Sequence, residues 1–135
     1  MIFVSITRLR VRSWRFMPAF AFYAFRSMRQ ARKAAGNLGT RLLADRRNTF
    51  WTATAWTSDA AMREFMLAGT HRQAMSKLAH WCDEAAVAHW NQENERLPTW
   101  QEAWIRLQRE GRKSKVLHPA SAHIAQQFAA PRSND

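Results

Sequence analysis

The run 49-TFWTATAWTSDAAMREFM-66 decides the fold, because a strand pattern changes to a helix pattern inside it. Successive side chains of a strand point to opposite faces. In residues 49–57 one face carries Phe50, Thr52, Thr54 and Trp56, and the other carries Trp51, Ala53 and Ala55. Ser58 is a favourable helix N-cap and Asp59 suits the first turn of a helix that stops at Gly69. The run therefore predicts a strand with apolar bulk on both faces, followed by a helix.

The residues before this run predict a strand, a helix and a second strand. Residues 2–11 are rich in β-branched and aromatic residues and settle into alternation. From Pro18 the apolar residues follow a helical stripe that ends at Gly36, which predicts a helix of about 18 residues. Residues 40–46 then pair with residues 49–57 as a hairpin.

The residues after this run predict a second helix and a fourth strand. Thr70 and Gln73 have the spacing of a capping box, in which each side chain satisfies the other residue's backbone N–H. Helical spacing places His71 on the same inward face as three apolar residues, which are Met75, Leu78 and Cys82. Residues 84–91 alternate again and predict a fourth strand.

The C-terminal part predicts one more helix and a tail. Thr99 and Glu102 form a second capping box, and the apolar side of the helix they begin runs to a stop at Gly111. We expect residues 1–111 to form one domain and residues 112–135 to form a flexible basic and polar tail, with room for a short helix after Pro119.

The order strand, helix, strand, strand, helix, strand predicts an α+β fold, the ferredoxin-like sandwich with a four-stranded antiparallel sheet and both helices on one face. The strands nevertheless carry large apolar residues on both faces. A second copy of the same sheet would cover the other face, so we expect a homodimer that encloses a barrel-like cavity.

Composition limits the partners and the compartment. The 135 residues carry a net charge of +11, and residues 1–44 hold nine Lys or Arg and no acid, which favours an anionic partner such as nucleic acid, lipid headgroups or an acidic ligand. Cys82 is the only cysteine and no zinc spacing occurs, so a disulfide scaffold and a structural zinc site are excluded and a cytoplasmic protein is expected. The apolar run 16–25 is too short to span a membrane and lacks a signal-peptidase pattern.

Three stretches resemble a known superfamily: 12-RSWRFMPAFAFYAFRSMRQAR-32, the segment 45–75, and 81-WCDEAAVAHW-90. They are similar to the dimeric α/β-barrel superfamily that contains antibiotic-biosynthesis monooxygenases, and more narrowly to uncharacterised bacterial proteins described as similar to spheroidene monooxygenase. The resemblance covers about residues 2–92. It implies a ferredoxin-like fold, a homodimer and a pocket between the sheet and the helices. Activities in the superfamily range from cofactor-free oxygenation of polycyclic substrates to haem degradation and ligand binding, and the fold does not select among them.

The resemblance also bears on the cofactor. Haem-degrading members use a histidine on the second helix, an asparagine on the first strand and a nearby tryptophan. The matching positions here are Met75 for the histidine and Phe65 for the tryptophan, and the first strand offers Ser5 and Thr7 but no asparagine. This departure argues against a haem-degrading triad. The resemblance leaves haem open as a cofactor but does not require it.

His71 is the candidate catalytic residue. A helix N-terminus disfavours the imidazolium ion, so a neutral ring that can relay a proton is expected there. The alternative is a packing role with a hydrogen bond to backbone. The candidate substrate-binding residues are Trp51, Trp56, Phe65, Met75 and His89, of which Trp51 and Trp56 lie on opposite strand faces. His80, His118 and His123 are expected at the surface or in the tail, and no metal site is expected.

Two charged groups of the strands need partners. Arg8 and Arg10 share a strand face with Ile6, and we expect them to lie at an edge or to pair with Asp45, Glu84 or an anionic ligand. Asp83 and Glu84 are adjacent in a strand and should face opposite ways, so they do not form a general acid/base pair.

These observations support three functions. The first is a monooxygenase-like enzyme or binder that takes a small apolar ligand, polycyclic or isoprenoid, between Trp and Phe rings, with His71 handling a proton. The second is a non-catalytic interaction module at a protein or anionic membrane surface, through peripheral contact. The third is nucleic-acid binding through the basic N-terminal half, which no recognition motif accompanies.

Overall fold

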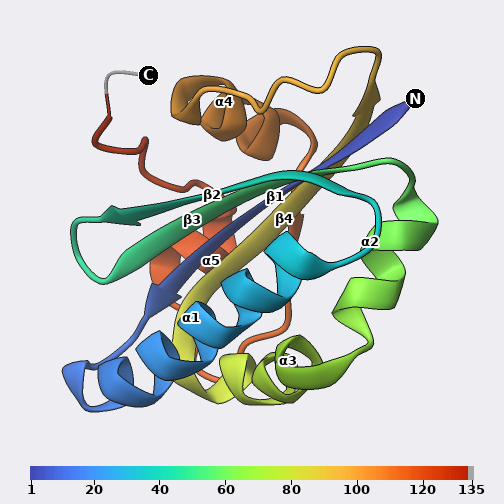
Figure 1. The fold of residues 1–135 in the computed structure, drawn as a ribbon. Helices are drawn as coiled ribbons and strands as arrows, with labels where there is room; N and C mark the ends of the chain where they lie inside the picture. Colours follow the sequence, from blue (N-terminus) through green and yellow to red (C-terminus); the bar gives the residue numbers. More distant parts are fainter. Residues whose placement is uncertain (134–135) are drawn as a thin grey trace.

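The computed structural model describes residues 1–133 and has a five-stranded sheet between two helical layers (Figure 1). In chain order the elements are β1 (Ile2–Val11), η1 (Trp14–Phe16), α1 (Met17–Lys33), β2 (Asn37–Asp45), β3 (Thr49–Trp56), α2 (Asp59–Met66), α3 (Gly69–Trp81), β4 (Cys82–Gln92), α4 (Trp100–Glu110), β5 (Arg112–Lys113) and α5 (Ser121–Ala125). None of the helices in this described part is both long enough and apolar enough to cross a bilayer.

The sheet confirms the predicted ferredoxin-like core. Its strand order is β2-β3-β1-β4-β5 and every neighbouring pair is antiparallel. The two-residue strand β5 was not predicted and extends the sheet beyond β4. The register of the central strands sets Thr7 of β1 opposite Thr52 of β3 and Val87 of β4, so these three side chains share one face of the sheet.

One face of the sheet is covered by α1, α2 and α3. Phe3 and Trp56 pack there with Phe65 of α2, and Val11 packs with Phe20 of α1 and with other residues of a second cluster. Gly36 makes the return from α1 to β2, and its φ of +87° requires glycine, since a Cβ there would lie 2.7 Å from the Cβ of Ala61.

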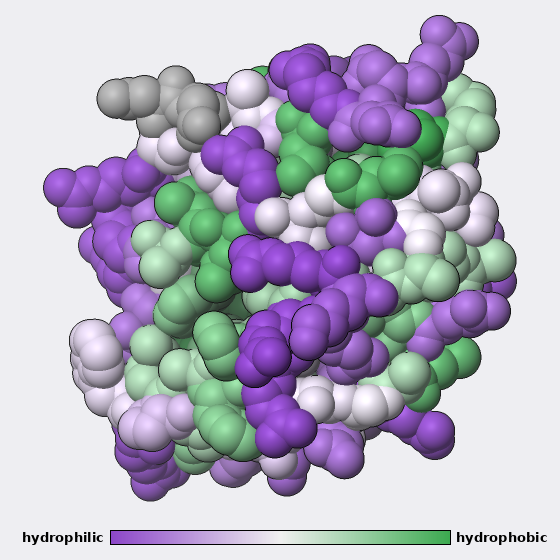
Figure 2. Space-filling model, viewed as in Figure 1, coloured by the Kyte–Doolittle hydropathy of each residue, from purple (hydrophilic) through white to green (hydrophobic). Residues whose placement is uncertain are grey.

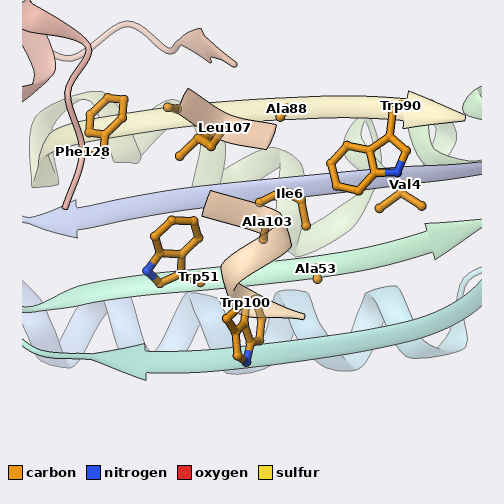
Figure 3. Packing of buried hydrophobic residues seen from close by; sticks show 11 residues of the cluster. Val4, Ile6, Trp51, Ala53, Ala88, Trp90, Trp100, Ala103, Leu107 and Phe128 are labelled. Atoms are coloured by element: carbon orange, nitrogen blue, oxygen red, sulfur yellow. The ribbon is translucent and has the colours of Figure 1, made fainter. Parts of the chain in front are cut away.

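The other face is covered by α4 and by the segment that follows it. The apolar side of α4 lies across the strands, and its buried residues face the Trp-rich side of β1, β3 and β4 (Figure 3). Phe128 closes one end of this layer and its side chain is 3% exposed. The buried members of the cluster are Val4, Ile6, Trp51, Ala53, Ala86, Ala88, Trp90, Trp100, Ala103, Leu107 and Phe128.

This layer corrects the physical argument for a dimer. The sequence correctly predicts that both faces of the strands are buried, but the chain covers the second face itself. The sequence predicts the helix that ends at Gly111 but not the surface on which its apolar side packs. A homodimer therefore cannot form through this face while α4 stays in place.

Residues 112–133 are attached to the sheet in this structure. Ser114 N–H donates to Ala85 O at 2.9 Å, and the Trp104 indole N–H donates to Phe128 O at 2.8 Å. His123 is 6% exposed and its Nδ1 accepts from Ala85 N–H at 3.2 Å, which corrects its expected place at the surface. The flexibility of this segment in solution stays a prediction, and positions 134–135 lie outside the described residues.

The start of α3 differs from the prediction. The N-cap is Ala68, and the expected box between Thr70 and Gln73 does not form. Instead the side chain of Gln30, from α1, accepts from His71 N–H at 3.0 Å and donates to Ala68 O at 2.8 Å. A residue 41 positions away thus replaces the local cap. The second predicted box, Thr99 with Glu102, is present at the start of α4.

Candidate functional site

A cavity of about 90 Å³ lies between the helices α1 and α3 and the sheet. Most of its wall is apolar and comes from side chains of α1, α3 and the strands β1, β2 and β3. Six lining residues carry a side-chain nitrogen or oxygen atom, and they come from β1, β3, α1 and α3. The lining residues are Thr7, Leu9, Phe20, Tyr23, Ala24, Ser27, Met28, Leu42, Phe50, Thr52, His71, Ala74, Leu78 and Trp81. The position agrees with the pocket that the resemblance implies.

His71 reaches this cavity from the first turn of α3. Its ring packs against Phe65 with 4.4 Å between centroids, and its Nδ1 lies 3.5 Å from Met66 O. A carbonyl only accepts hydrogen bonds, so the tautomer with its proton on Nδ1 suits this long contact, and that tautomer has a lone pair on Nε2. Burial lowers the pKa of His71 from its usual 6.5, and the Met66 carbonyl partly offsets the shift. His71 is therefore a neutral base at neutral pH.

Ser27 is the second polar group of interest. It is 5% exposed, and within the described residues its Oγ has no hydrogen-bond partner. Leaving a buried hydroxyl unsatisfied costs about 1–3 kcal/mol, so such groups are usually paired with protein, water or ligand. Ser27 lines the same cavity as His71 and the Thr7–Thr52 pair. The cavity thus offers hydroxyl groups and one neutral imidazole within an apolar wall.

None of the aromatic candidates Trp51, Trp56 and Phe65 lines the cavity. Two of them pack behind His71, and the third lies on the other face of the sheet. Trp56 stacks on Phe65 with 5.2 Å between centroids, and Phe65 in turn contacts His71. Neither ring lines the cavity; Phe65 packs directly against His71, and Trp56 supports Phe65. Trp51 lies on the other face of the sheet under α4, where it is fully buried, so it takes no part in this cavity.

Met75 and His89 do not line the cavity. Met75 is 42% exposed on α3, because Ala74 occupies the inward position beside it. His89 lies on β4 opposite Ser5, on the face that α1, α2 and α3 cover, with its ring 5.2 Å from that of Phe3. Burial lowers the pKa of His89, and the nearby charge of Arg112 lowers it further.

Arg8 and Arg10 of β1 form ion pairs with acidic residues of β4. Arg8 is 4% exposed and donates to Glu84 at 2.6 Å, with Trp51 and Phe128 on its guanidinium. Arg10 lies 3.0 Å from Asp83 and 3.4 Å from Glu84.

The two acids do not face opposite ways as expected. The register of β1 and β4 shifts between Arg10 and Val11, and this irregularity brings both carboxylates to one guanidinium. Burial raises the pKa of Asp83, which Arg10 partly counteracts. These groups are paired on the α4 side of the sheet and lie outside the cavity.

The residues present do not fit haem. The position that would supply the haem-binding histidine is Met75, which points away from the cavity, and a volume of about 90 Å³ is smaller than the roughly 150 Å³ cavity that holds benzene. Within residues 1–133 no group of three or more His, Cys, Asp or Glu side chains is placed to hold a metal ion.

Sequence reasoning missed Ser27, Gln30 and the Thr7–Thr52 pair. Ser27 stands on the buried stripe of α1, where a hydroxyl among apolar residues is the signal that marks it. Gln30 carries no local signal, because its role depends on contact between α1 and the junction of α2 with α3. The resemblance draws attention to Thr7 on the first strand and alternation places Thr52 on a strand face, but only the sheet register pairs the two.

The chain belongs to the family described as a domain of unknown function, DUF3291, which matches residues 16–127. The search of curated proteins finds no match. Among solved structures, Rv0793 from Mycobacterium tuberculosis superposes with a TM-score of 0.63 at 13% identity, over 70% of this chain and 98% of that one.

Two further structures carry named activities. An antibiotic biosynthesis monooxygenase superposes with a TM-score of 0.59 at 14% identity, over 70% of this chain and all of that chain (100%). SnoaB, a cofactor-independent oxygenase from Streptomyces nogalater, superposes with a TM-score of 0.55 at 18% identity, over 69% and 94%. At these identities the likeness shows that this chain and these structures share a fold, and it shows no more than that. The narrower resemblance to spheroidene-monooxygenase-like proteins has no counterpart here.

Proposed function

We propose that the chain is a monooxygenase-like enzyme or binder that takes an apolar ligand into the cavity between α1, α3 and the sheet. The observation that carries the proposal is His71, a neutral imidazole on the wall of an apolar cavity. Its ring packs against Phe65, and its backbone N–H donates to the side chain of Gln30. Its Nε2 would accept a proton from the ligand, and the Ser27 hydroxyl would bind a polar ligand atom. The fold shared with a cofactor-independent oxygenase supports this direction.

The size of the cavity limits the ligand. A volume of about 90 Å³ is smaller than the roughly 150 Å³ cavity that holds a single benzene, so an intact polycyclic ring system does not fit the conformation described. Of the two expected ligand classes, an isoprenoid chain is the better match, because its narrow end can enter while the rest stays outside. A polycyclic ligand would require α1 to move away from α3.

The test uses two probes, farnesol for the isoprenoid class and naphthol for the ring class. Binding of both probes is followed by tryptophan fluorescence, since Trp81 lines the cavity. Turnover is followed by oxygen consumption with naphthol, because its phenol can give a proton to His71 and electrons to oxygen, whereas farnesol serves as a binding probe. Ala74→Phe fills the cavity and should abolish binding, whereas Met75→Phe, at the exposed neighbouring position, should leave it unchanged. His71→Ala should abolish turnover and keep the fold. If Ala74→Phe binds both probes as the wild type does, the cavity is not the site.

The homodimer stays a prediction with a changed geometry. Since α4 covers the second sheet face, two copies would have to meet through another surface. Sedimentation velocity over a range of concentrations tests it, and a single-chain mass throughout would contradict it.

A further inference from the structure

The outer surface of α1 combines exposed aromatic rings with arginines. Trp14 of η1 is 76% exposed, Phe22 is 55% exposed and Phe25 is 62% exposed. Phe22, Phe25 and Arg29 have the spacing of one side of α1, and Trp14 lies in the short 3-10 element that leads into this helix. Exposed large apolar side chains gathered on one surface mark an interaction site more often than isolated ones do.

The charge of this surface has one sign. The segment formed by η1 and α1 carries Arg15, Arg26, Arg29, Arg32 and Lys33, and α3, which packs beside α1, carries Arg72 and Lys77. None of these three elements contains Asp or Glu. The acids of this helical layer lie on α2, as Asp59 and Glu64. Figure 2 shows hydrophobic side chains in green between long hydrophilic ones in purple on the side where α1 lies in Figure 1.

The rings and the guanidinium groups are paired along the helix. The guanidinium carbon of Arg26 lies 5.4 Å from the ring centre of Phe22, and that of Arg29 lies 5.9 Å from the ring centre of Phe25. Each pair has the i, i+4 spacing that brings side chains together on a helix surface. The apolar rings and the charged groups therefore project from the same side of α1.

We propose that this surface, Trp14, Phe22 and Phe25 with Arg15, Arg26 and Arg29, docks the protein on an anionic lipid bilayer. Phenylalanine and tryptophan rings on one side of a helix enter the boundary between headgroups and acyl chains, and the flanking arginines bind lipid phosphates. Each basic residue near an anionic membrane adds to the attraction. The inference rests on the outer face of α1 and is independent of the cavity beneath it.

A single-stranded nucleic acid is the competing partner for basic and aromatic residues. Stacking on a base needs an open ring face, and an arginine already covers one face of each phenylalanine ring. Docking on a bilayer needs only that the rings be exposed and that the arginines be free of acidic partners. We therefore make nucleic acid an outcome of the test.

The experiment measures cosedimentation of the full chain with vesicles of phosphatidylcholine alone and of phosphatidylcholine mixed with phosphatidylglycerol. The wild type should bind the anionic vesicles more tightly, and added salt should weaken this binding. Phe22→Ser with Phe25→Ser should weaken it at least tenfold. Arg26→Gln with Arg29→Gln should weaken it about thirtyfold, at about 1 kcal/mol for each arginine.

Matched controls lie on α4, across the sheet. Arg106→Gln with Arg109→Gln removes the same charge, and Ile105→Ser removes an apolar side chain that is 46% exposed. Both should change vesicle binding by less than about twofold. The proposal is overturned if the wild type does not bind anionic vesicles, or if the α4 variants lose as much binding as the α1 variants. It is also overturned if the α1 variants lose single-stranded RNA binding and keep vesicle binding.

Discussion

Replacement of Leu107 by alanine tests whether α4 is a core element of the fold. Leu107 is fully buried in the layer between α4 and the sheet. Its neighbours in this cluster include Ala53, Ala86 and Ala88 on the strands, and alanine side chains cannot extend to fill a void. The space left by the leucine should therefore persist instead of collapsing.

The expected loss follows from this geometry. Leu→Ala changes at fully buried sites cost about 2.7–5.0 kcal/mol, and the cost rises with the volume that stays empty. We expect about 3–4 kcal/mol for Leu107→Ala, which is a large share of the roughly 5–15 kcal/mol by which domains are stable. The control is Ile105→Ala on the same helix. Ile105 is 46% exposed, so its replacement should cost about 1 kcal/mol or less.

The assay is urea unfolding followed by circular dichroism, with the slope compared between variants to check for unchanged two-state behaviour. The free energy of unfolding should fall much more for Leu107→Ala than for Ile105→Ala. If the two variants lose the same amount, α4 does not cover the sheet in solution. A stability that rises with protein concentration would instead indicate that a second copy supplies the cover.

Three further predictions concern the helix cap, the histidines and the cysteine. Thr99→Ala removes a formed capping box and should lower the free energy of unfolding by about 1 kcal/mol in urea unfolding. Thr70→Ala, at a helix start where no box forms, should lower it much less. Equal losses would contradict the assignment of the caps. Burial lowers the pKa of three histidines below the usual 6.5, so the unfolded chain takes up protons before the folded chain as the pH falls. These residues are His71, His89 and His123. The melting temperature should therefore be highest above about pH 6.5 and decline on acidification. A melting temperature that does not change with pH would refute this. Burial raises the pKa of the Cys82 thiol to about 12, so Ellman's reagent should modify it only after unfolding, and rapid reaction of the folded protein would refute its burial.

Local signals in the sequence predicted the elements and their faces. The alternation in residues 49–57 placed Trp51 and Trp56 on opposite faces, which the structure confirms, because the period of a strand is a local property. The same alternation could not tell what covers each face. The cover of the second face is α4, which lies about 50 residues further along the chain.

In the candidate site, too, local spacing predicts some residues, while others depend on contacts between distant elements. His71 was found because helical spacing puts it on the inner side of α3, and Met75 was misplaced because the same spacing was carried one turn too far. Ala74 takes the inward position instead. Ser27 and Gln30 depend on how α1 packs against other elements, and a single sequence contains no record of that contact.

The sheet separates the Trp-rich packing under α4 from the hollow beneath α1 and α3. Strand residues such as Thr7 and Thr52 point to the hollow, while Ile6 and Ala53, their neighbours in sequence, point to the packed side. A library of substitutions confined to the hollow would therefore leave the hydrophobic cluster under α4 untouched. This arrangement makes the chain a suitable scaffold for evolving new ligand preferences, since the wall that meets the ligand can change while the opposite layer keeps the protein folded.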